Sequence, residues 1–426
     1  MLAGGFHVIA GVRRVPAPAG PEAPHGGHAA MASEYRAVDF ARMTTEADWT
    51  PLLGDVDAVV NLVGIFRESA EQRFDVLHRA APVALFAACT QQGVRLVIQM
   101  SALGADERAV TDFHRSKRAA DDYLIGLGID ALVLQPSLVF GADGTSARLF
   151  CALATLPCLA LPGGGRQPVQ PVHVDDVAQA IVAALAAWGT AAQLASGRLA
   201  LVGPQPLPLA AYLEALRHGL GLRGRAWVLP LPRGLSAAMM PLAERITGGV
   251  LGRDALTMLD QGSVADAGPL TRLLGRAPRA TSQFIPPELR GALRAQALLR
   301  WFNPVLRWSL ALVWIITAIV SLGLYPVADS YALLARAGVP AALQPLALYG
   351  AALLDLAFGV LCVLPRRPRW LWAAQMALIV GYTAIISVRL PEYWLHPYGP
   401  LSKNLPMLAV LWWLHLTEER AWTTSR

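Results

Sequence analysis

The stretch from Val94 to Lys117 reads VRLVIQMSALGADERAVTDFHRSK and decides the fold of the N-terminal part of the chain. It opens with a mostly apolar run that shows little alternation, which is typical of a parallel strand covered on both faces. Ser101 follows this predicted strand directly. Phe113 and Lys117 stand at i and i+4, on one face of the helix predicted there. Ligands of open α/β sheets bind at the carboxyl ends of the strands, so a site is predicted beside Ser101.

This order of residues resembles the active centre of the short-chain dehydrogenase/reductase family. There a Tyr stands in place of Phe113 and moves a proton. The family Lys lowers the phenol pKa and holds the nicotinamide ribose, and the family Ser orients the substrate. The resemblance makes Ser101 and Lys117 the predicted catalytic positions, with Phe113 in place of the expected acid. Phenylalanine has no proton to give, so proton transfer requires a substitute such as His114, Ser101 or water.

Strands and helices are predicted to alternate on both sides of this stretch. The pattern predicts strands at 7–12, 35–40, 57–64, 94–100 and 131–140, and helices at 45–53, 72–92 and 113–127. Such alternation indicates a doubly wound parallel α/β sheet of the Rossmann type. A further helix is predicted to begin within VHVDDV, with Asp175 as its N-cap and His173 as a structural histidine. The resemblance covers roughly residues 1–290 and includes a small C-terminal lobe.

The beginning of the chain departs from the family pattern. In dinucleotide-binding folds a first strand and a G-x-x-G-x-x-G turn, which cradles the pyrophosphate, come before a strand such as His7–Val12. They are missing here, so an N-terminally truncated Rossmann-like domain is expected. Two explanations stay open: the start codon is misassigned, or the protein lacks its phosphate cradle.

The resemblance implies a nicotinamide cofactor, NAD(P). Arg13 and Arg14 follow the first strand, where Arg accommodates a 2′-phosphate, so NADP is slightly favoured over NAD. Two solvated surface arginines are the alternative. The remaining cofactor-binding positions are those that match family motifs: Asp39, Asn61 and Gly64 of NLVG, Lys117, and Pro136 and Ser137 of LQPSLVFG.

Composition limits the other function classes. Hydrophobic residues make up 54% and charged residues 15% of the 426-residue chain, where soluble proteins average about 25% charged residues. The net charge of +6 comes from scattered arginines, without a basic run fit for nucleic acid. His25 and His28 have no carboxylate or Cys at ligand spacing, so no metal site is predicted. The unpaired cysteines are expected to be buried small hydrophobes in a reducing compartment: Cys89, Cys151, Cys158 and Cys362.

Four apolar runs near the C-terminus predict a membrane domain. The first is Trp308–Tyr325, the second lies between Arg336 and Arg366, and the third lies between Arg369 and Arg389. The fourth, Asn404–Leu416, is short and interrupted by Pro406. A spanning helix needs ~20 apolar residues. Buried helices of a soluble domain are the alternative. The unit resembles the DoxX-like membrane family, in which W-L-H-P-[YF]-G-P-x-x-K-N precedes the last span, as WLHPYGPLSKN does here.

Polar residues inside and beside these runs form a second candidate site. Asp355 lies within a span, and an intramembrane carboxylate is a functional candidate with Lys403 or His396 as its expected partner. Lys403, His396 and Asn404 are expected at the membrane edge. A polar clasp between spans and a ligand site remain equal alternatives. Arginines at 300, 307 and 366–369 place both termini and the soluble domain in the cytoplasm, so a multi-pass inner-membrane protein is expected.

The sequence thus predicts an NAD(P)-binding Rossmann-like domain at 1–290, a linker at 291–303 and a four-helix DoxX-like domain at 304–426. The first domain best resembles the atypical branch that includes an accessory subunit of respiratory complex I. One function is nucleotide binding with weak or no redox turnover, in a membrane or redox-homeostasis role. The alternative is an NAD(P)-dependent oxidoreductase or epimerase-like enzyme acting on a lipid or quinone-like substrate. Expected partners are the bilayer, such a substrate and a membrane protein.

Overall fold

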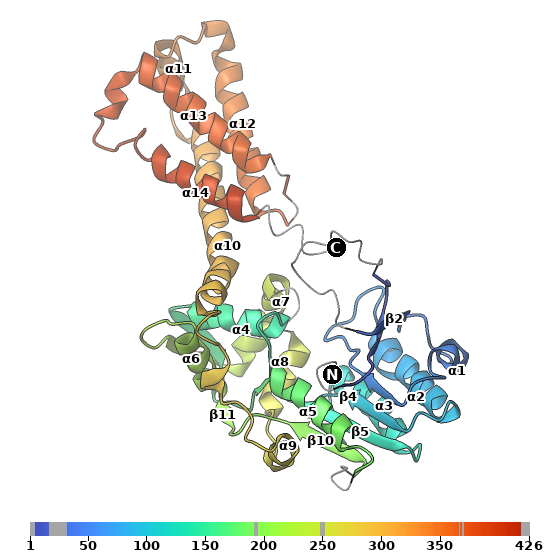
Figure 1. Cartoon of the computed structure of the whole chain (residues 1–426). Helices are drawn as coiled ribbons and strands as arrows, with labels where there is room; N and C mark the ends of the chain where they lie inside the picture. Colours follow the sequence, from blue (N-terminus) through green and yellow to red (C-terminus); the bar gives the residue numbers. More distant parts are fainter. Residues whose placement is uncertain are drawn as a thin grey trace. The chain divides into compact units, whose positions relative to one another are not determined.

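The protein divides into two compact units, Met1–Ala297 and Leu298–Arg426, each described here by itself (Figure 1). The computed structural model describes residues 5–16, 32–190, 195–247, 252–365, 367–368 and 370–418. Four residues named from the sequence lie outside these ranges: His25, His28, Arg366 and Arg369.

A parallel four-stranded sheet forms the centre of the first unit. Its order is β10-β5-β4-β3, from Gly197–Leu201, Asp130–Pro136, Leu96–Met100 and Ala58–Asn61. β1 (Ile9–Val12) and β2 (Glu34–Ala37) form a separate parallel pair. The carboxyl ends of β3, β4 and β5 therefore lie at one edge of the central sheet.

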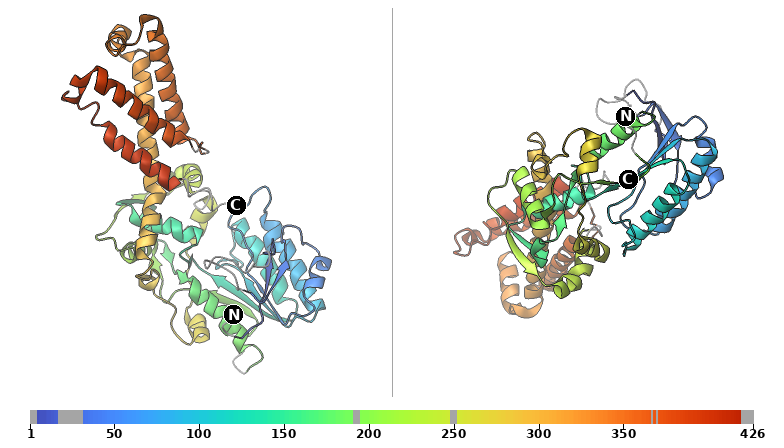
Figure 2. Two further views of the ribbon diagram at one scale, coloured as in Figure 1. Left: turned by 45° about the horizontal axis from the view of Figure 1, so that its top comes forward. Right: turned by 90° about the horizontal axis from the view of Figure 1, so that it is seen from below.

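Helices cover both faces of this sheet, as the apolar run of β4 predicts (Figure 2). On one face, η3 (Asp75–Ala80), α2 (Ala81–Gln91) and α3 (Asp112–Ile125) pack with the alternate strand residue Val97. On the other face, α5 (Val174–Ala187) and α9 (Gly268–Leu274) pack with its neighbour Ile98. Successive strand residues point to opposite faces, so one strand serves two cores. The predicted doubly wound α/β fold is confirmed.

Several helices and strands begin or end at residues other than those predicted, because of local hydrogen bonds and turns. The predicted helix at 45–53 is α1 (Glu46–Trp49) continued by the 3₁₀ turn η2 (Thr50–Leu52). The predicted strand at 131–140 breaks after β5, and β6 (Val139–Phe140) pairs instead with β9 (Val172–His173). Ser137 stands at the break, where its N–H donates to the Leu201 carbonyl at 3.0 Å.

The N-cap of α5 is His173, so the prediction of Asp175 is wrong. His173 Nδ1 accepts the Asp175 backbone N–H at 3.2 Å. The Asp175 carboxylate instead lies in the first turn and accepts a hydrogen bond from Arg279. His173 is buried and also contacts Arg279 through Nδ1 at 2.9 Å, which supports its structural role.

A smaller lobe completes the first unit. Its core joins Phe140, Tyr212, Leu216 and Phe284. Its elements are α4 (Thr145–Thr155), β7 (Cys158–Pro162), η4 (Gly163–Gly165), β8 (Pro168–Val169), β11 (Leu207–Pro208), α6 (Leu209–Gly219), β12 (Trp227–Leu231), α7 (Arg233–Thr247), α8 (Arg253–Gln261) and η5 (Thr281–Gln283). The expectation of buried cysteines is wrong for Cys158, because its side chain lies on the outer face of β7, whereas the other three cysteines are buried.

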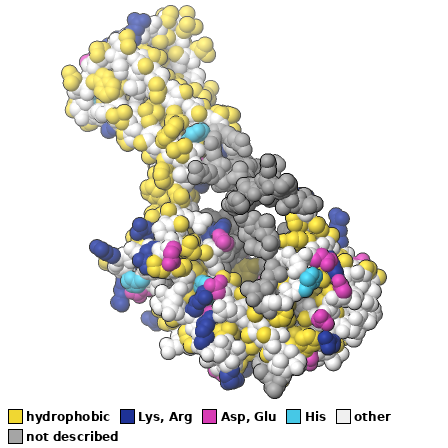
Figure 3. Space-filling view, in the orientation of Figure 1, with side chains coloured by type: hydrophobic (Ala, Val, Ile, Leu, Met, Phe, Trp, Pro, Cys, Tyr) yellow, Lys and Arg dark blue, Asp and Glu magenta, His cyan; other side chains and the backbone are white. Residues whose placement is uncertain are grey.

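Apolar helices make up the second unit, and Figure 3 shows few charged side chains on its described surface. Among the residues that the structure describes, three helical stretches are long and apolar enough to cross a membrane: Arg290–Leu324, Ala341–Val363 and Leu371–Arg389. The helices are α10 (Arg290–Ile319), η6 (Val320–Leu324), α11 (Val327–Arg336), η7 (Ala341–Leu343), α12 (Gln344–Val363), α13 (Leu371–Arg389), η8 (Pro391–Trp394) and α14 (Asn404–Glu418). The predicted fourth span, α14, has only 15 residues. Residues 291–303, assigned to a linker from the sequence, lie inside α10.

Candidate functional site

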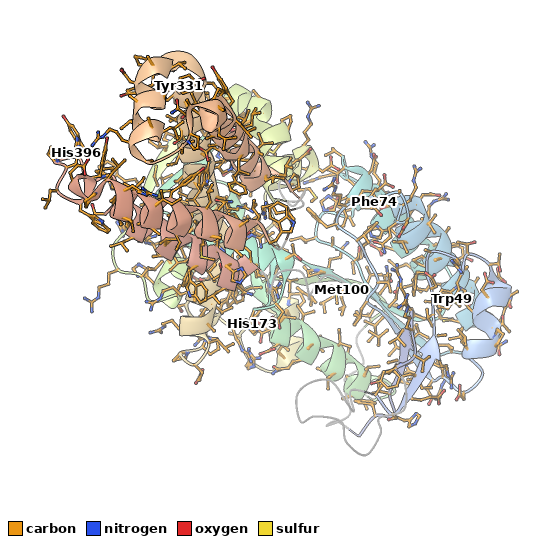
Figure 4. All side chains as sticks on the ribbon, turned by 90° about the horizontal axis from the view of Figure 1, so that it is seen from above. Trp49, Phe74, Met100, His173, Tyr331 and His396 are labelled. Atoms are coloured by element: carbon orange, nitrogen blue, oxygen red, sulfur yellow. The ribbon has the colours of Figure 1, made fainter. Side chains whose placement is uncertain are left out.

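The carboxyl edge of the central sheet gathers the predicted site residues. Asn61 ends β3, Pro136 ends β5, and Ser101 follows β4 with its N–H donating to the Leu134 carbonyl at 2.8 Å. Met100, labelled in Figure 4, is the last residue of β4. Polar side chains from strands separated in sequence thus meet where ligands of such sheets bind.

Lys117 reaches this edge from α3 and is buried there. Its Nζ donates to the Met100 carbonyl at 2.9 Å and to the Val63 carbonyl at 3.4 Å. Burial lowers the pKa of Lys117 to about 8. A Cβ on Gly64 would stand 2.8 Å from Nζ. Glycine at this position therefore leaves the space that the ammonium group occupies, which links two of the predicted cofactor residues.

Ser101 is tied to an acid that the sequence analysis missed. Its Oγ donates to the carboxylate of Asp121, and both side chains are buried. Burial raises the pKa of Asp121 to about 6, and its Oδ1 has no hydrogen-bond partner among the described residues. Asp121 follows Lys117 by one helical turn, so the i, i+4 pattern from Phe113 already held the signal.

Phe113 packs into an aromatic cluster. Its ring centroid lies 5.4 Å from that of Phe66, 5.9 Å from that of Phe74 and 5.5 Å from that of His78, all edge to face. Such pairs contribute about 0.5–1.5 kcal/mol each beyond area burial. An apolar ring, held from several sides, therefore occupies the position where the family carries its proton donor.

His78 is a second buried residue that the sequence did not reveal. Its Nε2 accepts the Ile65 N–H at 3.0 Å, and Nδ1 lies 3.0 Å from Ser116 Oγ. The Ser116 hydroxyl donates to the Phe113 carbonyl, so the proton shared with His78 belongs to Nδ1. Burial, aided by the charge of Lys117, lowers the pKa of His78 to about 3. This neutral imidazole fixes the segment that follows β3.

His114 is the titratable ring next to Phe113 on α3, at a centroid distance of 5.3 Å. It is buried, and its Nδ1 has no hydrogen-bond partner among the described residues. Burial lowers its pKa. Gly104, with φ +94°, leaves room for the ring, because a Cβ there would stand 3.1 Å from Cε1.

Two other predicted residues meet at the ends of β1 and β2. Arg13 Nε lies 3.8 Å from Asp39 Oδ1, and Arg42 Nε lies 3.6 Å from Asp39 Oδ2. Arg14 is exposed beside them. This is the edge of the β1–β2 pair at which an adenosine ribose or 2′-phosphate is expected from the resemblance.

Asn61 and Ser137 make structural hydrogen bonds. Asn61 Nδ2 donates to Gln99 Oε1 at 2.8 Å, and its Oδ1 accepts the Val63 N–H at 3.1 Å. The Ser137 hydroxyl donates to the Gln170 carbonyl, which joins the end of β5 to the small lobe. Both side chains shape the sheet edge through these bonds.

In the described part of the second unit, Asp355 makes no ion pair with either of its predicted partners. Asp355 is buried within α12, and its Oδ1 has no hydrogen-bond partner in the described part of the chain. Lys403 and His396 are exposed in the segment that precedes α14. Asn404 instead joins α14 to α13, with Nδ2 donating to Thr383 Oγ1 at 2.8 Å. A hydrogen bond between two helices is what the polar-clasp alternative predicts for this residue.

Known proteins match both units. Residues 22–193 match the family model described as NAD dependent epimerase/dehydratase family, and residues 311–412 match the DoxX-like family. The chain is 31% identical over 136 residues to NADH dehydrogenase [ubiquinone] 1 alpha subcomplex subunit 9, mitochondrial, of Arabidopsis thaliana, covering 32% of this chain and 34% of that protein. It is 25% identical over 169 residues to the NADH-ubiquinone oxidoreductase 40 kDa subunit, mitochondrial, of Neurospora crassa, covering 40% and 43%. The chain thus spans less than half the length of these curated relatives.

A solved nucleoside-diphosphate-sugar epimerase from Staphylococcus aureus has the same fold. Its TM-score is 0.50 at 16% identity, over 67% of this chain and 92% of that chain. The family match supports binding of a nicotinamide nucleotide by the first unit. The matches thus fall on separate parts of the chain: residues 22–193 are similar to the NAD dependent epimerase/dehydratase family, and residues 311–412 are similar to the DoxX-like family.

Proposed function

We propose that the chain is a membrane-tethered protein that binds a nicotinamide nucleotide with weak or no redox turnover, in a membrane or redox-homeostasis role. The single observation that carries this proposal is the packing of Phe113 among three aromatic rings at the proton-donor position. A nucleotide can be held there, but a protonated side chain is not aimed at its substrate.

The polar groups at the sheet edge fit a bound nucleotide. Lys117 would hold the nicotinamide ribose, which requires donors but no phenol. Asn61 and Gly64 would form the wall beneath it. Arg13, exposed at the end of β1, would meet a 2′-phosphate, which favours NADP. When bound, the nucleotide supplies a hydride donor or acceptor.

The serine position also supports weak turnover. The Ser101 O–H donates to the buried Asp121 carboxylate, so its proton is directed away from a substrate carbonyl. Loss of a positioned general acid typically lowers a rate by about 10²–10⁴. Ser101 and Phe113 thus occupy the positions of the family site, but neither side chain is placed to give a proton to a substrate.

The alternative is an oxidoreductase or epimerase-like enzyme that acts on a lipid or quinone-like substrate. The observation in its favour is His114, whose buried Nδ1 lacks a described partner beside Phe113. A substrate that reached this nitrogen would find a proton acceptor. In that case wild type turns over briskly, and His114→Gln abolishes turnover and leaves nucleotide affinity unchanged, whereas the preferred proposal expects weak or no turnover in both proteins.

Charged groups in the second unit support the proposed orientation. Glu418 at the end of α14 lies 3.4 Å from Arg307 of α10 and 3.4 Å from Arg367, which precedes α13. Three chain segments thus bring their charges to one end of the helices. Because arginine-rich ends face the cytoplasm, this end is proposed as the cytoplasmic one, in an inner membrane.

Nucleotide binding is tested with the two lysines of the sequence. The full chain in lipid nanodiscs is titrated with NADPH and with NADH, and the nicotinamide fluorescence is followed. Lys117→Met is expected to weaken binding at least tenfold, because the ribose loses its donor. Lys403→Met, an identical change at an exposed position of the other unit, is the control. Equal affinities of Lys117→Met and wild type would exclude the proposed ribose site.

A further inference from the structure

The outer face of the β7–β12 ribbon in the first unit is apolar and open. The two strands run parallel, with Cys158 opposite Trp227 and Ala160 opposite Leu229. All four residues are exposed, Trp227 by 80% and Leu229 by 53%. Their strand neighbour Leu159 is buried in the small-lobe core. Thus β7 alternates between exposed and buried residues, whereas β12 is exposed on both faces from Trp227 to Pro230.

The next element along the chain repeats this feature. In α7, Leu235 and Met239 are exposed at i and i+4, whereas Ser236 and Met240 are buried. Single exposed hydrophobic residues are ordinary on a soluble surface, but their concentration in two consecutive elements marks an interaction surface. The name ribbon surface is used below for these outward residues of β7, β12 and α7: Cys158, Ala160, Trp227, Leu229, Leu235 and Met239.

Along the sequence, the segment that carries β12 and the first part of α7 has only positive charges. No Asp or Glu occurs between Glu214 and Glu244, whereas Arg223, Arg225 and Arg233 lie within that stretch and are exposed. Arg225 pairs with Glu214 at 2.7 Å. An exposed Trp with aliphatic neighbours and arginines suits the boundary between anionic headgroups and acyl chains.

The membrane helices of the same chain favour a bilayer over a soluble partner. A surface linked covalently to a spanning helix meets lipid at a high effective concentration, so a modest apolar area is enough for lasting contact. We propose that the ribbon surface inserts into the interfacial layer of an anionic bilayer and holds the nucleotide-binding unit against the membrane. Trp227 and Leu229 enter the acyl boundary, and the arginines pair with lipid phosphates.

Cys158 makes this proposal testable without an added cysteine. It is exposed on the ribbon surface, and the other three cysteines are buried. A thiol-reactive nitroxide is attached to the full chain, which is then reconstituted in liposomes of phosphatidylglycerol and phosphatidylcholine. Spin relaxation by lipid-soluble oxygen and by a water-soluble nickel chelate is compared. The Cys158 label is expected to favour oxygen at least threefold over a control label on Asp57→Cys in a Cys158→Ser background, where the native side chain is 80% exposed.

The decisive comparison is between the label on Cys158 of the otherwise unchanged chain and the label at the control position. Equal chelate access at Cys158 and at the control position would overturn the proposal. If protection of the label from the chelate disappears when the protein is diluted among more lipid, a second copy of the chain covers the ribbon surface. That result would also overturn the proposal. Trp227→Ser with Leu229→Ser is expected to restore chelate access, and nucleotide affinity in the same sample reports that the unit is folded. None of these outcomes depends on turnover or on the identity of the substrate.

Discussion

At the scale of single residues, Phe113 is the position at which nucleotide binding and catalysis can be tested separately. Phe113→Tyr adds a phenol hydroxyl, and Lys117 is expected to lower the pKa of that hydroxyl, as the Lys does in the family that the site resembles. We expect any residual reductase activity to rise by about 10²-fold, at the lower end of the usual contribution of a positioned acid. Steady-state nicotinamide absorbance measures the rate. Phe66→Tyr, a change at another ring of the same cluster, is the control, and an equal rise there would contradict the assignment.

Asp121 gives a prediction about pH. Burial raises its pKa to about 6, so the folded protein binds this proton more tightly than the unfolded chain does. The stability contributed by the protonated acid is complete below about pH 4 and is lost as the pH rises through about 6. Asp121→Asn keeps an acceptor for Ser101 but carries no charge. We therefore expect the variant to be more stable than wild type at pH 8, by up to about 3 kcal/mol of unfolding free energy, and this difference to close as the pH falls to about 4, where the acid is protonated in the folded protein.

Thermal unfolding of the full chain in detergent at both pH values measures this difference. Asp122→Asn, at the exposed neighbouring position, controls for the general loss of a negative charge. A stability gain that is the same at pH 8 and at about pH 4 would show that burial of the Asp121 charge is not its cause.

Site residues could be predicted where the residues that act together are close in the sequence. Lys117 and Ser101 were predicted from the resemblance of one strand and helix to the short-chain dehydrogenase/reductase active centre, and one more helical step leads from Lys117 to Asp121. His78 could not be predicted, because its role arises from a hydrogen bond to Ile65 and contact with α3, which are set by tertiary packing. The charge pair predicted for Asp355 is not seen, because its Oδ1 has no hydrogen-bond partner among the described residues.

At the scale of elements, Gly359 determines how closely α10 and α12 approach. A Cβ there would stand 2.6 Å from Ile315 Cγ1 and 3.1 Å from the Ala311 carbonyl oxygen. Small residues at such contacts let membrane helices pack closely. Gly359→Val is expected to lower stability by about 1–3 kcal/mol through overpacking. Thermal unfolding in detergent measures the loss.

Gly350 on the same helix is the matched control, because no atom lies within 4 Å of a Cβ built there. Gly350→Val should change stability by less than about 0.5 kcal/mol. Equal losses at the two positions would mean that valine disturbs α12 itself rather than its contact with α10.

Strands and helices were predicted well wherever burial alone shapes the pattern. β4 lies within the apolar run that predicts it, because it is covered on both faces. The break between β5 and β6 was missed, since it depends on bonds from Ser137 to Leu201 and Gln170, which are remote in sequence. The fourth apolar run was predicted to begin at Asn404, where α14 begins, and the helix continues two residues beyond the predicted end, to Glu418.

At the scale of the whole molecule, the membrane topology depends on α14. We expect a reporter fused after Arg426 to read the cytoplasmic side and one inserted at Tyr398 to read the opposite side. The ion pairs of Glu418 with Arg307 and Arg367 favour this result, because they hold the end of α14 beside other arginine-bearing segments. If both reporters read the same side, the 15-residue α14 does not span and the count is three.

The central claim is that the first unit binds a nicotinamide nucleotide but transfers hydride poorly. The most direct measurement follows both events in one sample of the full chain in nanodiscs. Nicotinamide fluorescence reports binding of NADPH or NADH, and absorbance reports oxidation in the presence of quinone and aldehyde panels. We predict saturable binding and oxidation no faster than in nanodiscs without protein. Brisk oxidation by wild type, or absence of saturable binding, would contradict the account.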